Sequence, residues 1–103
     1  MEIRVQKNNL SKAIGLTGGV SAQKANTLPI LGNLLLETTK DKKLRVVGTD
    51  LEVGVSTVIP VEVDKEGSIT VPSKKLHDIV RELPEGEIEI TVAKIIYIRG
   101  IKG

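Results

Sequence analysis

Alternating and helical hydrophobic patterns follow one another at the start of the chain. Glu2–Gln6 alternates polar and apolar residues, which predicts a strand with one buried face. Asn8 or Asn9 can cap the helix that follows. The apolar positions of this helix have the spacing of a buried stripe: Leu10, Ala13, Ile14 and Thr17. Gly18-Gly19 predicts its end, so Val20–Thr27 is expected to be a loop.

The middle of the chain predicts three consecutive strands with short turns between them, Leu34–Thr39, Leu44–Gly48 and Leu51–Ile59. Short connections favour an antiparallel meander. In the third strand the alternation changes phase at Val58-Ile59, which predicts a bulge or a bend. Asp64–Gly67 is then expected to form a turn.

The rest of the chain repeats the opening pattern. A short strand, Ser68–Val71, leads through Pro72 to Ser73, a good N-cap, and to a helix over Lys74–Leu83. The apolar face of this helix comprises Leu76, Ile79, Val80 and Leu83. Two more strands are expected, Glu87–Val92 and Lys94–Arg99.

The two strand–helix units align at a constant spacing of 66 residues, with Ile3-Arg4-Val5 matching Ile69-Thr70-Val71. The pattern therefore predicts an α+β domain with a duplicated β-α-β-β-β half and two helices packed on antiparallel sheet. By this symmetry the second half lacks its last strand.

Composition narrows the possible classes of protein. The 103 residues suit one domain, and they include no cysteine, which excludes disulfides, thiol nucleophiles and thiolate metal sites. The apolar runs are too short to span a bilayer, and the start has no leader pattern, so we expect a cytoplasmic protein without a membrane partner.

The net charge of +2 is small, but its distribution is uneven. Ile3–Leu36 contains four basic residues and no acidic one, and the second predicted helix adds more basic residues. Basic charge therefore concentrates around two segments, each of which contains a predicted helix.

Four motifs in register carry a resemblance to a known family. They are TLPILGNLLL at Thr27–Leu36, GTDLE at Gly48–Glu52, VPSKKL at Val71–Leu76 and LPEG at Leu83–Gly86. In order and spacing they closely resemble the first domain of the bacterial sliding clamps, the beta subunits of DNA polymerase III. The resemblance extends from Met1 to about Val92, and Ala93–Gly103 matches poorly.

The resemblance implies a DNA-clamp fold and a processivity factor that is not an enzyme and needs no cofactor. Clamp chains hold three similar domains, and two chains close into a ring around double-stranded DNA with helices lining the hole. The other partners would be further clamp domains, and DNA polymerase III and the clamp loader, which bind later domains. We expect residues 1–103 to form a single N-terminal clamp domain that is incomplete at its C-terminal end.

Five basic residues are the candidates for sequence-independent contact with phosphates: Lys12, Lys24, Lys74, Lys75 and Arg81. Lys24 precedes the TLP motif, where the family commonly has a basic residue, and Lys74 and Lys75 match basic family positions. Lysines at a helix N-terminus oppose the helix dipole, so stability does not explain them. Arg81 can instead pair with Asp78, and each lysine can be an ordinary solvated charge.

Other chemistry has little support in the sequence. His77 is the only histidine and is expected on the helix surface, so no metal site is predicted. Asp50 and Glu52 are expected on the solvent-exposed face of a strand. Ser73 has no recognisable general base that could activate it as a nucleophile. The alternatives to a clamp domain are a protein-interaction module acting through an exposed strand edge, and a non-functional clamp fragment.

Overall fold

The computed structural model describes residues 1–25, 32–49 and 54–101. Two helices and eight strands occur in these ranges, all but one of them predicted. In chain order the elements are β1 (Glu2–Gln6), α1 (Lys7–Ala25), β2 (Asn33–Thr38), β3 (Lys43–Thr49), β4 (Gly54–Pro60), β5 (Glu62–Lys65), β6 (Ser68–Pro72), α2 (Ser73–Glu82), β7 (Glu87–Val92) and β8 (Ile96–Ile101).

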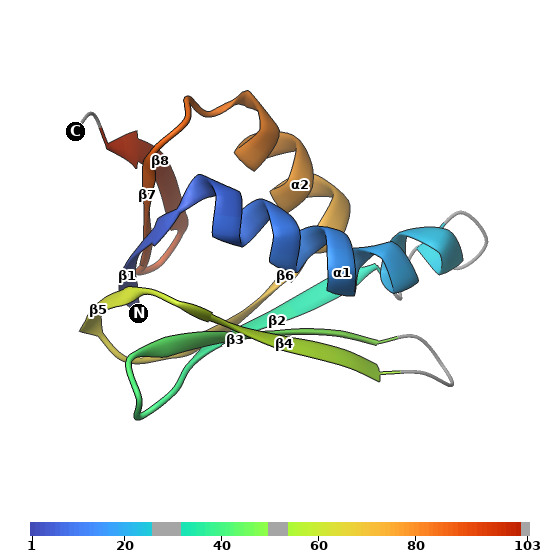
Figure 1. The fold of residues 1–103 in the computed structure, drawn as a ribbon, viewed down its shortest axis with the longest axis horizontal. Coiled ribbons are helices and arrows are strands. Elements are labelled where there is room, and N and C mark those ends of the chain that lie inside the picture. The colour runs from blue at the N-terminus through green and yellow to red at the C-terminus, as the bar shows by residue number, and fades with distance from the viewer. Residues whose placement is uncertain (26–31, 50–53, 102–103) are drawn as a thin grey trace.

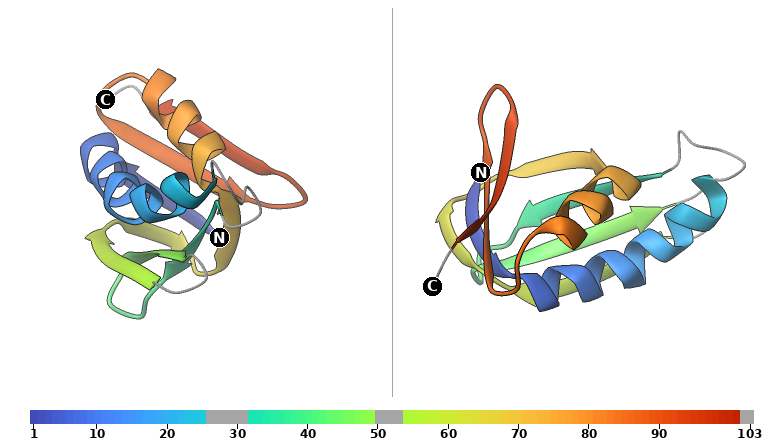
Figure 2. Two further views of the ribbon diagram at one scale, coloured as in Figure 1. Left: turned by 90° about the vertical axis from the view of Figure 1, so that its right-hand side faces the viewer. Right: turned by 90° about the horizontal axis from the view of Figure 1, so that it is seen from above.

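The described strands form two antiparallel sheets of four strands each. One has the order β5-β1-β7-β8 and is called the β8 sheet; the other has the order β4-β3-β2-β6 and is called the β4 sheet. Both helices lie on the same side of the β4 sheet, and the β7–β8 hairpin stands beside α2 at one end of the domain (Figures 1 and 2). This is the predicted α+β fold, and its antiparallel strands are divided between two sheets.

The predicted duplication is visible in the pairing. Each half gives its first strand to the sheet of the other half, because β1 pairs with β7 and β6 pairs with β2. Ile3 and Val5 lie opposite Ile90 and Ile88, as Ile69 and Val71 lie opposite Leu36 and Leu34. The first amide of each helix donates to a glycine carbonyl of the other half: Lys7 N to Gly86 O at 2.8 Å, and Ser73 N to Gly32 O at 2.6 Å.

The hydrophobic core lies between the helices and the two sheets. It combines inward-facing strand residues with the predicted stripe of α1 and with Leu76 and Val80 of α2. The largest fully buried side chains are aliphatic: Ile3, Leu10, Leu34, Leu36, Leu44, Leu76, Ile88 and Ile90. With one aromatic residue in the chain, packing depends on leucine, isoleucine and valine, as expected from composition.

The predicted end of α1 is wrong. The helix continues through Gly18-Gly19 to Ala25, so most of the expected loop is helical. A helical glycine costs only about 1 kcal/mol relative to alanine, which packing can offset. Thr17, just before the pair, is fully buried, and its hydroxyl donates to the carbonyl of Ala13 at 2.7 Å. The helix therefore continues beyond a local stop signal that costs it little.

The predicted side-chain caps are also wrong. α1 begins at Lys7, so Asn8 and Asn9 lie within the helix rather than before it. α2 begins at Ser73, its N-cap is Pro72, and no side chain caps it. Ser73 is buried instead, and both its amide and its hydroxyl donate to the carbonyl of Gly32. The glycine carbonyls described above replace local caps at both helices.

Two predictions about the strands need correction. The register between β3 and β4 is continuous, so the expected bulge at Val58-Ile59 does not form, and Val58 is an exposed apolar residue. The register shift lies instead between β1 and β5. β5 (Glu62–Lys65) occupies part of the expected turn, because its polar sequence pairs with the edge of β1.

Candidate nucleic-acid interface

The two helices provide a shared scaffold for basic side chains. α1 buries Leu10, Ala13 and Ile14 and packs against α2, which buries Leu76 and Val80. The helices lie side by side (Figure 2), so the outward faces of both belong to one surface. The first turn of each helix contains no acidic residue.

α1 carries two of the predicted residues. Lys12 is exposed and makes no ion pair within the described part of the chain. The backbone of Lys24 belongs to the last turn of α1 rather than to a loop, and its side chain lies outside the described residues. Of these two side chains, the structure describes only Lys12, which points to solvent.

The first turn of α2 presents Lys74 and Lys75. Both side chains are exposed, and neither forms an ion pair with any residue that the structure describes. Asp78, one turn later, pairs with other groups: its carboxylate lies 3.6 Å from Arg81 and 3.7 Å from His77. The anchoring of buried Ser73 to Gly32 fixes the start of this helix. Two adjacent lysines therefore project from a rigid helix end.

Arg81 is in a different position from the lysines. It lies in the last turn of α2, where its guanidinium is 3.6 Å from Asp78 and 3.9 Å from Glu82. Its side chain is 63% exposed, and surface pairs of this kind are weak. Arg81 can reach a ligand only in competition with two neighbouring carboxylates.

Lys7 and Arg4 belong to the structure rather than to the free basic surface. The Nζ of Lys7 donates to the carbonyl of Leu83 at 2.5 Å and lies 3.6 Å from Glu85. A cation at this end of α2 complements the helix dipole. Arg4, on the β8 sheet, donates two hydrogen bonds of 3.2 Å to Asp64, which raises the pKa of its guanidinium above the ordinary value. Neither residue is among the five candidates for phosphate contact, and these contacts agree with that choice.

Evidence for a catalytic or metal site is lacking in the described ranges. No cluster of three or more potential metal ligands occurs in residues 1–25, 32–49 and 54–101. His77 is an exposed surface residue, as predicted, and Asp50 and Glu52 lie outside the described residues. Neither described helix is long and apolar enough to cross a membrane.

Comparisons with known proteins identify the family of this chain. Residues 1–97 match the family described as DNA polymerase III beta subunit, N-terminal domain. The chain belongs to this family. The beta sliding clamp of Vibrio harveyi is 43% identical over 89 residues, which cover 85% of this chain and 60% of that protein. The Escherichia coli K12 clamp is 42% identical over 87 residues, covering 84% of this chain and 23% of that protein.

Solved beta subunit structures agree with this assignment. The Caulobacter crescentus beta sliding clamp aligns with the whole chain at a TM-score of 0.87 and 30% identity, over 28% of its own length. The clamp of Bartonella birtlesii, bound to griselimycin, aligns with 95% of the chain at a TM-score of 0.83 and 36% identity, over 26% of its length. The chain has the clamp fold, and it spans about a quarter of these beta subunits.

One contact of this beta subunit domain was missed by sequence reasoning. Lys7 joins the start of α1 to the end of α2, and the sequence pattern does not predict this contact. The repeat does indicate that the two positions are equivalent, since Lys7 and Ser73 are 66 residues apart and each begins a helix. What the repeat cannot provide is the partner, because the two residues reach different carbonyl groups.

Proposed function

We propose that this chain is one arc of a ring-shaped, non-catalytic clamp that surrounds duplex DNA and keeps a replicative polymerase on its template. Membership of the beta subunit family supports this role. The observation that carries it is the shared helical surface, on which Lys12, Lys74 and Lys75 are exposed without ion pairs among the described residues. This surface would face the DNA.

The contacts would be with phosphates alone. Lysine is a flexible point charge that neutralises phosphate without reading bases. Lys24, in the last turn of α1, would be a further phosphate contact. The chain has no tryptophan or phenylalanine on which single-stranded bases could stack. Binding would therefore be independent of sequence and sensitive to salt.

Charge neutralisation on the helical surface tests this proposal. In the triple variant Lys12→Gln, Lys74→Gln, Lys75→Gln, binding of a fluorescent duplex at low salt should fall at least about tenfold. The parent should bind weakly, and its log–log salt dependence should correspond to no more than about three phosphates, at a slope of roughly −0.9 for each. Fluorescence anisotropy across a salt series measures both quantities.

A matched variant controls for net charge. Lys40→Gln, Lys42→Gln, Lys43→Gln removes the same charge from the exposed turn between β2 and β3 and from the exposed first residue of β3, away from the helices (Figure 1). This variant should bind DNA nearly as well as the parent. Equal weakening of both variants, or low-nanomolar binding by the parent at physiological salt, would contradict the proposal.

The wider assembly belongs to the same proposal. Further clamp domains would complete the ring, in a homodimer of three-domain chains, and the polymerase and the clamp loader would bind those later domains. Replication of a bacterial chromosome would place the protein in the cytoplasm. A second function, strand-edge interaction with other proteins, is favoured by a groove next to β8.

A further inference from the structure

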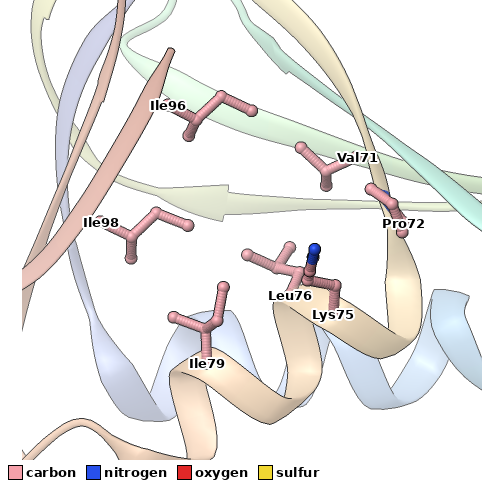
Figure 3. A pocket seen from close by; sticks show the side chains of 7 residues that line it. All are labelled: Val71, Pro72, Lys75, Leu76, Ile79, Ile96 and Ile98. Carbon is pink, nitrogen blue, oxygen red and sulfur yellow. The ribbon is translucent and has the colours of Figure 1, made fainter.

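An apolar groove of about 370 Å³ opens on one side of α2, between this helix and β8. Figure 3 shows Ile96 and Ile98 of β8 projecting toward Leu76 and Ile79 of α2. Lys75 is the one charged residue among those that line the groove. This side of α2 therefore belongs to the apolar packing of the domain.

The internal repeat identifies the equivalent strand in the other half. Gly48 of β3 lies opposite Leu34 of β2. In the same way Gly100 of β8 lies opposite Ile88 of β7. β8 therefore occupies the position in its sheet that β3 occupies in the β4 sheet. The groove is thus part of how α2 packs on its own half, and ionisable chemistry has to be sought on another face of the helix.

A row of ionisable side chains follows α2 outside the groove. Lys74, His77 and Arg81 are separated by three and four residues, so they lie on one side of the helix and form what we call the α2 row. None of the three lines the groove. Lys74 is exposed, and the side chains of His77 and Arg81 are 54% and 63% exposed. A molecule that binds this face can reach all three side chains.

One carboxylate oxygen contacts two members of the α2 row. Oδ1 of Asp78 lies 3.7 Å from Nδ1 of His77 and 3.6 Å from Nη2 of Arg81. When His77 is neutral, Asp78 offsets the charge of Arg81. When His77 is protonated, two cations share the same carboxylate. The row then carries one more positive charge, and Asp78 holds Arg81 less strongly.

The elements that pack against α2 bring no further ion-pair partner to His77 within residues 1–25, 32–49 and 54–101. β6 contains no charged residue. The other charged side chains of α2, α1 and β2 in these ranges have different partners or face solvent: Glu82 contacts Arg81, Glu37 pairs with Arg45, Lys7 contacts the Leu83 carbonyl and Glu85, and Lys12 and Lys75 are exposed. The charge of the α2 row near neutral pH therefore depends on His77.

We propose that His77 is a further phosphate contact of the DNA-facing surface, and that it acts only when its imidazole is protonated. This inference rests on the proposed function and makes the proton a regulator of the same surface. Protonated His77 would contact the DNA backbone beside Lys74 and would release Arg81 from Asp78 for a second contact.

The direction of the pH dependence follows from the charge of the imidazole. Histidine ordinarily changes charge between pH 5 and 8, and His77 is the only histidine in the chain. Since the protonated form is the one that binds phosphate, DNA affinity should rise as the pH falls through this range.

Fluorescence anisotropy of a rhodamine-labelled duplex at low salt, at about pH 7.5 and about pH 5.5, tests the proposal on either side of the histidine titration. The parent should bind at least about threefold more tightly at the lower pH, and its log–log salt slope should steepen by about 0.9 for each added phosphate contact. His77→Gln should bind equally at both pH values. His77→Arg should bind at the higher pH about as tightly as the parent does at the lower pH.

Moving the histidine provides the matched control. Ser56 is an exposed residue of β4 that alternates with buried Ile59, so it lies on the face of the β4 sheet opposite to the helices. Ser56→His combined with His77→Gln keeps one histidine in the chain and should bind DNA independently of pH. Arg81→Gln should weaken binding more at the lower pH, because Asp78 holds Arg81 at the higher pH.

NMR titration of the His77 imidazole gives an independent readout. Saturating duplex should move its titration midpoint to higher pH, because DNA favours the protonated form. Equal affinity of the parent at both pH values, pH dependence that survives His77→Gln, or the same pH dependence in the Ser56→His control would overturn the proposal. The proposed function fails separately, if the triple variant at Lys12, Lys74 and Lys75 binds duplex at the higher pH as tightly as the parent.

Discussion

Leu44 and Ile96 occupy equivalent positions in the two sheets, yet Leu44 is fully buried and Ile96 is 37% exposed. The local sequences do not explain this difference, because both residues are aliphatic and both strands pair in the same register with the strand before them. The difference comes from the neighbour on the other side, since β4 covers β3 and β8 has only β7 among the described strands.

This contrast shows that one strand determines how much of a helix–sheet layer becomes core. α1 packs against β3 and β4 together, so the layer beneath it is closed on both sides. α2 packs against β6 and β2, and the groove remains between it and β8. Burial of apolar surface provides most of the folding free energy, so the two halves should contribute unequally to stability.

The largest expected effect comes from deleting the equivalent side chains. Leu44→Ala should lower the free energy of unfolding by about 3–4 kcal/mol, since it leaves a cavity in a closed core. Ile96→Ala should cost about 1 kcal/mol or less, because its side chain is already partly hydrated. Denaturant titration of both variants measures the difference. Similar losses in the two variants would mean that the groove is closed in solution.

Alanine at the two equivalent glycines sharpens the same comparison. A Cβ at position 48 would lie 2.3 Å from the backbone oxygen of Thr17, which is too close, so Gly48→Ala should cost about 2–3 kcal/mol as α1 is displaced. At position 100 the Cβ would lie 3.1 Å from the ring of Pro84, which a small shift relieves. Gly100→Ala should therefore cost less than about 1 kcal/mol. Thermal melts would measure both, and a reversed order would contradict the assigned equivalence.

Much of the fold could be predicted because the hydrophobic pattern is regular where the core forms. The stripe of α1, the meander and the second helix follow from spacing alone, and the 66-residue repeat predicts the duplication. The misses occur where local signals do not decide the structure. Gly18-Gly19 does not end α1, and Ser73 bonds to Gly32 rather than capping α2. No local rule contains the position of Gly32.

The exposure of the candidate lysines was predictable to a similar degree. The sequence identifies which residues are basic, and the helical spacing places Lys12, Lys74 and Lys75 on outward faces. It could not identify what Lys7 contacts, because the carbonyl of Leu83 that accepts its hydrogen bond lies 76 residues away along the chain. The groove also escaped prediction, since Ile79 and Ile96 belong to different elements and meet only in the folded chain.

Smaller effects than at Leu44 and Gly48 are expected at the two residues that begin the helices, where the halves use different chemistry. Lys7→Met removes a charged donor from the carbonyl of Leu83 and should cost about 1–2 kcal/mol in unfolding free energy. Ser73→Ala removes one of two hydrogen bonds to the carbonyl of Gly32. It should lower the free energy of unfolding by about 1 kcal/mol, because the hydrogen bond from the backbone amide of residue 73 remains.

The salt dependence of duplex DNA binding distinguishes lysines that stabilise the fold from lysines that contact DNA. Lys7→Met should leave the slope of the salt dependence unchanged, although it removes one positive charge. Lys75→Met should lower that slope while leaving the melting temperature almost unchanged, since Lys75 is exposed and unpaired among the described residues. If Lys7→Met lowered the slope as much as Lys75→Met, the result would mean that Lys7 exchanges its hydrogen bond with the Leu83 carbonyl for a contact with a DNA phosphate. The two helix starts would then differ in function as well as in chemistry, because the buried hydroxyl of Ser73 has no charge to contribute to DNA.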